Sequence, residues 1–142
     1  MNITVRQGEI QNQAADVLVV NLFSGVRPGG ASGAVDKALG GQLSAAVDLG
    51  DCKGEAGETL LLYTLGQIPA PRVLVVGLGD QQRFDLESAR RAAGHAIAAL
   101  SRLGAQSAAT ILHGTGAGQL PVESAAQAVA EASLLAAYRF DT

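Results

Sequence analysis

Short apolar runs alternate along the chain with longer segments in which apolar residues recur at helical spacing. The runs are rich in β-branched and aliphatic residues and are bounded by glycine or proline, a pattern typical of strands that are buried on both faces. Five such runs occur, at residues 3–5, 17–23, 58–65, 72–79 and 107–114. The prolines of the GQIPAP segment exclude a helix and favour a turn, so we expect 58–65 and 72–79 to be neighbouring strands.

The longer segments predict helices on either side of this pair of strands. In AVDKALGGQLSAAV, residues 34–47, apolar residues follow helical spacing, but Gly40 and Gly41 are expected to split the helix. Asp85 can cap a second helix over 86–103, because its carboxylate can accept hydrogen bonds from the unpaired N–H groups of the first turn.

A third helix, expected to begin near Pro121 and to carry its apolar stripe as far as Ala136, completes the order β-β-α-β-β-α-β-α. Alternation of strands and helices predicts an α/β domain with three layers, α/β/α, around a mixed, mostly parallel sheet. A chain of 142 residues is near the commonest size for one domain, so residues 1–142 are expected to form a single domain.

Charge and composition narrow the classes of partner. Ten Lys and Arg against thirteen Asp and Glu give a net charge of -3. A protein that binds a polyanion needs basic residues clustered on one face. No nucleic acid and no membrane is therefore expected as a partner, and the apolar runs are shorter than the ~18 to 20 residues of a membrane span. The single cysteine, Cys52, and a start without a signal-peptide pattern indicate a reducing, cytoplasmic location.

Residues with catalytic chemistry are few and scattered. The two histidines, His95 and His113, and Cys52 lack the spacing of a zinc site, and no histidine is placed to act as a base for the thiol. His95 falls opposite the apolar stripe of its helix, which indicates a solvated surface residue. Ser32 misses the nucleophile-elbow pattern by one position. The sequence therefore predicts no catalytic residue and no metal ligand.

Three glycine-rich loops leave two interpretations open. GLGD at 77–80 begins like a dinucleotide fingerprint but lacks the third glycine, so a tight strand-to-helix turn is the alternative. HGTGAGQLP at 113–121 and PGGASGA at 28–34 offer unobstructed backbone N–H groups near helix starts, as anion-binding loops do. Glycines at strand ends also occur for purely steric reasons.

The stretch LGDCKGEAGETLLL at 49–62 and the chain end AEASLLAAYRFDT resemble the amino-terminal domain of the leucine aminopeptidase (cytosol aminopeptidase) family. That domain contains a G-D-x-x-G-x-x-G-E/Q-T-L-L-L segment and closes on Y-x-F-D. The matching residues are Asp51, Gly54, Gly57, Glu58, Thr59, Leu60, Leu61, Leu62, Tyr138, Phe140 and Asp141.

The resemblance implies a non-catalytic domain of a hexameric homo-oligomer, an exopeptidase that removes amino-terminal residues from peptides. The domain would contribute to assembly and to active-site access. Two divalent metal ions, zinc or manganese, and the catalytic lysine and arginine would lie in a carboxy-terminal domain that is absent from these 142 residues. The 49–62 stretch is accordingly interpreted as a structural turn, kept solvated by Asp51, Lys53 and Glu55.

The chain is also similar to macro domains, whose fold resembles that of this peptidase domain and which bind ADP-ribose. GEIQNQAADVLVVN at 8–21 looks like the macro G-D-I…D-A-I-V-N segment, with Glu9 in place of the usual aspartate. The sequence departs from the macro pattern where N-A-A-N has become Asn21-Leu22-Phe23-Ser24, and where Gln119 stands in place of a glycine. The alternative function is therefore a macro-type module that binds ADP-ribose or a related nucleotide. Its predicted ligand-binding residues are Glu9, Asn21, Gly29, Gly30, Gly33, Gly116 and Gly118.

Overall fold

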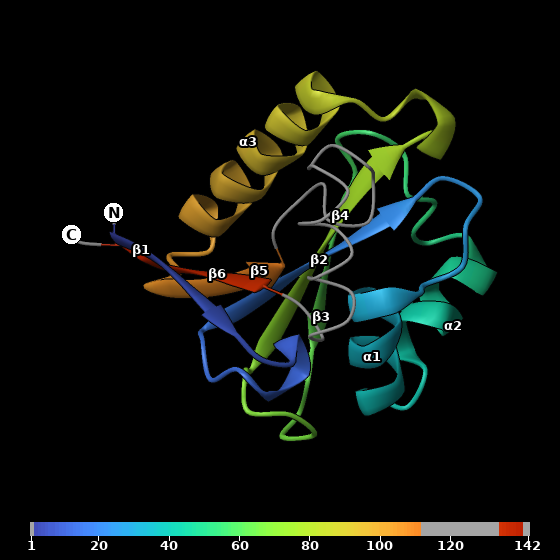
Figure 1. Cartoon of the computed structure of the whole chain (residues 1–142). Coiled ribbons are helices and arrows are strands. Elements are labelled where there is room, and N and C mark those ends of the chain that lie inside the picture. The colour runs from blue at the N-terminus through green and yellow to red at the C-terminus, as the bar shows by residue number, and fades with distance from the viewer. Residues whose placement is uncertain (1, 112–133, 141–142) are drawn as a thin grey trace.

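A mixed sheet of six strands runs through the computed structural model, which describes residues 2–111 and 134–140 (Figure 1). The strand order across the sheet is β1-β6-β5-β2-β4-β3. The strands are β1 (Asn2–Gln7), β2 (Val17–Phe23), β3 (Thr59–Tyr63), β4 (Arg72–Gly79), β5 (Ser107–Ile111) and β6 (Leu134–Arg139). The described helices are α1 (Gly30–Ala38), α2 (Gln42–Leu49), α3 (Leu86–Arg102) and the 3-10 turns η1 (Ile10–Asn12) and η2 (Gln81–Arg83).

Parallel pairing is confined to the middle of the sheet. Strand β2 pairs in parallel with β4 and with β5, whereas β1 with β6, β6 with β5 and β3 with β4 are antiparallel. The prediction of a mixed sheet is confirmed, but the expectation that it is mostly parallel is wrong. The reason for the β3–β4 pair is local, because a short hairpin connection allows only antiparallel pairing.

Strand β6 is the clearest departure from the predicted elements. The third helix was expected to reach Ala136, but residues 134–139 form a strand between β1 and β5. Leu135 and Ala136 are 0% and 1% exposed on opposite faces of that strand. Periodicity cannot separate a short apolar run in a buried strand from one in a helix. The remainder of the predicted helix, from Pro121, lies outside the described residues.

The predicted split of the first helical segment is confirmed. Helix α1 ends at Ala38 and α2 starts at Gln42, and Gly40 and Gly41 take the left-handed backbone angles φ +70° and +88° that favour glycine. Since Gly41 has no side chain with which to cap α2, the buried carboxylate of Asp36 does so from α1. It accepts hydrogen bonds from the N–H groups of Leu43 and Ser44, at 2.8 and 3.1 Å.

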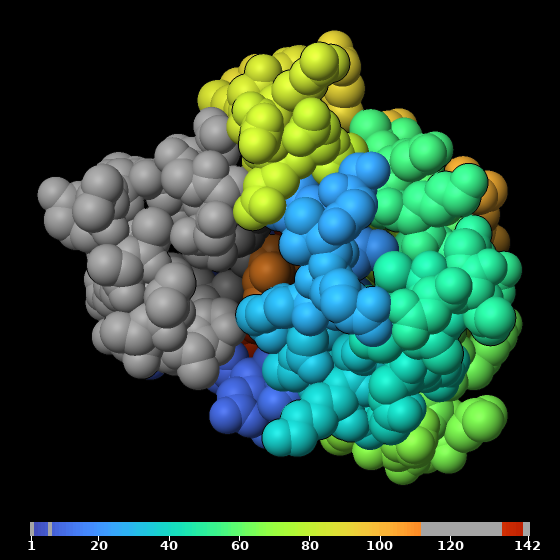
Figure 2. Space-filling view, turned by 90° about the vertical axis from the view of Figure 1, so that its right-hand side faces the viewer, coloured from blue at the N-terminus to red at the C-terminus, as the bar shows by residue number. Residues whose placement is uncertain are grey.

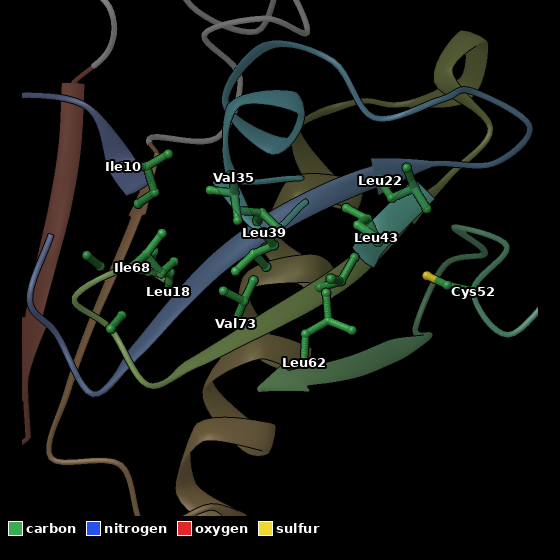
Figure 3. Packing of buried hydrophobic residues seen from close by; sticks show 14 of the residues in the cluster. Ile10, Leu18, Leu22, Val35, Leu39, Leu43, Cys52, Leu62, Ile68 and Val73 are labelled. Carbon is green, nitrogen blue, oxygen red and sulfur yellow. The ribbon is translucent and has the colours of Figure 1, made fainter. Parts of the chain in front are cut away.

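The helices cover both faces of the sheet, as the three-layer prediction required (Figure 1). Alternate residues of β2 enter two separate apolar clusters. Leu18, Val20 and Leu22 pack with α1 and α2 (Figure 3), whereas Val17 and Val19 pack with α3 on the other face. No helix in the described part of the chain is both long and apolar enough to span a membrane.

Helix α3 begins where the sequence predicted. The Asp85 carboxylate accepts a hydrogen bond from the Ser88 backbone N–H at 2.8 Å, and the hydrogen bonds from Ser88 lower the pKa of Asp85. The buried face is made mainly of alanine, which lets the helix lie close to the sheet. It comprises Ala92, Ala96, Ala99 and Leu100, while Leu86, the first residue of the helix, is 54% exposed.

Candidate functional site

The 51–58 loop folds around a carboxylate from its own chain. One carboxylate oxygen of Glu58, Oε1, accepts hydrogen bonds from the backbone N–H groups of Lys53, Gly54 and Glu55, at 2.9, 2.7 and 3.2 Å. Consecutive N–H groups that converge in a turn form an anion-binding concavity. Here the anion is Glu58 itself, so this concavity is already filled.

Glycines let the same loop lie directly on the carboxyl ends of β2 and β4. The Gly79 N–H donates to the Gly54 carbonyl at 2.8 Å, and the Gly77 N–H donates to the Glu58 carbonyl at 2.7 Å. A Cβ atom on Gly54 would lie 2.7 Å from the Phe23 carbonyl oxygen, and one on Gly77 would collide with the Glu55 carbonyl oxygen. The glycines of GLGD therefore serve a close backbone approach, which favours the steric interpretation of that motif over a dinucleotide fingerprint.

The structure agrees with the prediction that the loop is a solvated turn, and with a structural role for Cys52. Asp51, Lys53 and Glu55 are exposed, whereas Cys52 is 1% exposed and belongs to the cluster under α1 and α2 (Figure 3). Burial raises the pKa of the Cys52 thiol, which suppresses the reactive thiolate. His95 is exposed on α3, as predicted.

The predicted nucleotide-binding residues fall on adjacent elements that we call the η1–α1 region: Glu9, Asn21, Gly29, Gly30 and Gly33. Gly29 precedes α1 with an extended backbone, Gly30 opens the helix at φ +55°, and Gly33 lies in its first turn. The sequence predicted a loop until residue 33, so α1 begins earlier than expected. Turn η1, which follows Glu9, packs against α1.

Ser32 joins Asn21 to α1 through the backbone. The Ser32 hydroxyl donates to the Asn21 carbonyl at 2.6 Å, and its oxygen accepts from the Asn21 N–H at 3.2 Å. The described register of β2 with β5 ends at Val19, two residues earlier. The Ser32 hydroxyl of α1 thus continues the backbone hydrogen bonding of β2 beyond its pairing with β5. Sequence reasoning considered Ser32 only as a nucleophile and missed this role.

Glu9 is exposed and turned toward its own segment. Its Oε2 accepts hydrogen bonds from the side-chain amides of Gln11 and Asn12, at 3.1 and 3.2 Å. In the space-filling view the orange surface of β5 shows in a hollow beside the light-blue β2–α1 segment (Figure 2).

Gly116 and Gly118, like His113 and Gln119, lie outside the described residues, so the predicted ligand-binding set stays a prediction. Within residues 2–111 and 134–140, no group of three or more His, Cys, Asp and Glu side chains could hold a metal ion.

Comparison with known proteins matches residues 5–142 to the model of the "Cytosol aminopeptidase family, N-terminal domain". A probable cytosol aminopeptidase of Geobacter sp. (strain M21) is 40% identical over 141 residues, which are 99% of this chain and 28% of that protein. A second, of Azotobacter vinelandii, is 34% identical over 146 residues, also 99% and 28%. The chain therefore spans less than a third of the length of these relatives.

Solved structures share the fold at low sequence identity. The macrodomain of Mycobacterium tuberculosis DarG superposes with a TM-score of 0.66 at 18% identity, covering 89% of this chain and 86% of that one. A mutant of tomato leucine aminopeptidase gives a TM-score of 0.56 at 22% identity, covering 71% and 21%. An Oceanobacillus iheyensis macrodomain gives 0.59 at 16% identity, covering 93% and 80%. These likenesses establish a macro-like α/β fold.

Proposed function

Because the chain belongs to the cytosol aminopeptidase family, we propose that it acts as the non-catalytic amino-terminal domain of an aminopeptidase that removes amino-terminal residues from peptides. The match of residues 5–142 to the family's amino-terminal domain carries this proposal. The chain spans 28% of the Geobacter relative, so we assign the hydrolytic chemistry to the remaining part of the parent protein.

Two divalent metal ions, zinc or manganese, belong to that catalytic part by resemblance. The described residues do not fit such a centre, since no three potential ligands converge among them. We assign no step of the hydrolysis to the residues of this domain.

The contribution of the domain would be to assembly and to active-site access in a cytoplasmic homo-oligomer, a hexamer by resemblance. Leu49, Tyr63 and Leu65 on α2 and the β3–β4 hairpin are 78, 57 and 88% exposed, and a partner subunit that covers them would remove apolar surface from water. Strand β3 pairs only with β4 among the described strands, so its other edge is available for pairing. We propose no nucleic-acid or membrane partner.

A chimeric enzyme tests this role. In the Geobacter relative, the matched segment is replaced by this chain, and a second variant lacks the segment altogether. The chimera is expected to form the same oligomer as the unaltered relative in sedimentation velocity and to hydrolyse leucine p-nitroanilide. The deletion variant is expected to lose assembly or to change its rates on long peptides relative to short ones.

The 142-residue chain alone, assayed with Zn²⁺ or Mn²⁺, is the matched control and is expected to hydrolyse nothing above the blank. Hydrolysis by the isolated chain would overturn the non-catalytic assignment. A deletion variant with unchanged assembly and unchanged peptide preference would overturn the assignment to assembly and access.

A nucleotide-binding module is the second candidate. The gathering of Asn21, Ser32 and the α1 glycines beside η1 favours it, and one macrodomain of the same fold was solved with ADP. Calorimetric titration of the 142-residue chain with ADP-ribose, checked by thermal shift, separates the candidates. Saturable micromolar binding would support the module, and an absence of both heat and thermal shift would exclude it.

A further inference from the structure

A hollow of about 450 Å³ lies on the half of the sheet formed by β1, β6 and β5. We call it the β6 hollow. Its volume falls within the range of about 300 to 1,000 Å³ that is typical of small-molecule sites. Its lining comprises Asn2, Thr4, Gln13, Ala14, Ala15, Ser107, Ala108, Ala109, Ala137, Tyr138 and Arg139. The described members of the predicted nucleotide-binding set, Glu9, Asn21, Gly29, Gly30 and Gly33, are not among them.

The strand register places a cation in the middle of one polar row. Arg139 of β6 pairs with Asn2 of β1 on one side and with Ser107 of β5 on the other, and directly opposed residues of neighbouring strands share a face of the sheet. Among the described residues Arg139 enters no ion pair. Its side chain is exposed and lies between an amide and a hydroxyl in the register of the sheet.

The next row on the same face is small and largely apolar. Ala137 of β6 pairs with Thr4 of β1 and with Ala109 of β5, and Ala109 belongs to the cluster on the α1–α2 side of the sheet. Two methyl side chains on neighbouring strands leave the sheet surface recessed, and Ala14 and Ala15 add a low side wall. A flat apolar group can lie on such a floor.

Within residues 2–111 and 134–140, no acidic side chain lines the β6 hollow. Asp16 lies close to Ser107, but its Oδ2 is engaged by the backbone N–H groups of Gln106 and Ser107, at 2.8 and 3.3 Å, and it is not among the lining residues. Arg139 is the charged side chain among the described lining residues, and its guanidinium attracts an anion.

We propose that the β6 hollow binds a small organic anion. Its carboxylate or phosphate pairs with Arg139, and its flat apolar part lies against the half-buried Ala137. The proposal stands independently of the aminopeptidase assignment, because the residues involved have no part in it.

Benzoate and its neutral analogue benzamide are the probes, titrated into the ¹⁵N-labelled 142-residue chain by NMR. Benzoate is expected to shift the amide signals of Thr4, Ala109 and Ala137 along saturable curves, and phenyl phosphate should shift the same signals. Benzamide is expected to bind at least about tenfold more weakly, because it cannot form the charge-assisted pair with Arg139. Equal binding of benzoate and benzamide would overturn the proposal.

Two variants distinguish the contribution of the Arg139 charge to binding from that of the alanine surface. Arg139→Gln is expected to weaken benzoate binding about tenfold and to leave benzamide binding unchanged, whereas Ala137→Val should weaken both probes by filling the recess. Arg102→Gln, an exposed arginine on α3, is the matched control and should change neither. No saturable shift at these residues, or an Arg139→Gln variant that binds benzoate normally, would overturn the proposal. The comparison of the two probes on the unaltered chain decides the matter even if a variant fails to fold.

Discussion

The 51–58 loop and the η1–α1 region both depend on glycine, but for different reasons. A Cβ on Gly54 or Gly77 would meet backbone atoms of the chain itself. Around Gly30 no atom of the described residues lies within 4 Å of the position of a Cβ, and around Gly29 the one such atom is a backbone oxygen at 3.9 Å. The loop thus needs glycine for close packing, whereas Gly30 needs it only for its backbone angle of φ +55°.

The polar groups of the two regions differ in the same way. The loop N–H groups have their acceptor in Glu58, so an external anion would have to displace a tethered carboxylate. The Glu9 carboxylate is exposed and, in the described part of the chain, accepts hydrogen bonds from the neighbouring side-chain amides of Gln11 and Asn12. A glycine-rich motif indicates ligand binding only where the chain does not fill the space itself, and that is decided by packing.

The largest effect is expected for Gly77→Ala. The new methyl group would collide with the Glu55 carbonyl, so the loop must leave the sheet, and the free energy of unfolding should fall by about 3 kcal/mol. Urea denaturation measures this free energy of unfolding. Gly29→Ala, where the backbone is extended and the space open, is the control and should cost less than about 0.5 kcal/mol. Equal losses would contradict the close approach of loop and strand.

Ser32→Ala should cause the second largest loss of stability. It removes a buried hydroxyl that both donates to and accepts from the Asn21 backbone, at a cost of about 2 kcal/mol. Ser101→Ala on the exposed face of α3 is the matched control, expected to stay within about 0.5 kcal/mol. Chemical denaturation of both variants checks the difference, and a Ser32→Ala variant as stable as its control would show that water replaces the hydroxyl.

Glu58→Ala is expected to loosen the 51–58 loop from within. Three N–H groups lose their common acceptor, and we expect a loss of about 1.5 kcal/mol. The buried Cys52 thiol reports on the loop, because its reaction with a thiol reagent requires opening. Labelling should accelerate in Glu58→Ala and less in Glu58→Gln, which keeps one acceptor. An unchanged labelling rate in both variants would contradict the role of Glu58.

The smallest effect is expected at Gly30. Alanine fits the open space but not the left-handed backbone, so Gly30→Ala should destabilise by about 1 kcal/mol. Gly30→Asn should cost less, because asparagine tolerates that conformation better. Thermal unfolding of both variants beside Gly29→Ala tests this order. If all three variants unfold at the same temperature, the strain at Gly30 is relieved by a shift in the start of α1.

Features with a local signal were predictable. The GQIPAP turn made β3 and β4 neighbours, Gly40 and Gly41 split the helical segment, and Asp85 capped α3. Each of these signals acts within a few residues, through a fixed backbone angle or a single cap. The likeness of the 49–62 stretch to the aminopeptidase domain was likewise readable along the chain, and the family match agrees with it.

Strand β6 was not predictable, because its apolar run fits a helix as well as a strand. Its neighbours decided the outcome. Leu135 pairs with Ile111 of β5 and, on the other side, with a residue of β1 more than a hundred positions earlier in the chain. Long-range pairing overrides a weak local preference.

The sequence by itself determined the glycine positions, the strand-forming runs and the family. Only the tertiary structure decided what those residues do: that Glu58 fills the concavity made by Lys53 and Gly54, and that the Ser32 hydroxyl serves Asn21. A hydrogen bond between residues on different elements depends on distances that packing alone sets, and whether a glycine leaves space for a ligand depends on the backbone that lies against it.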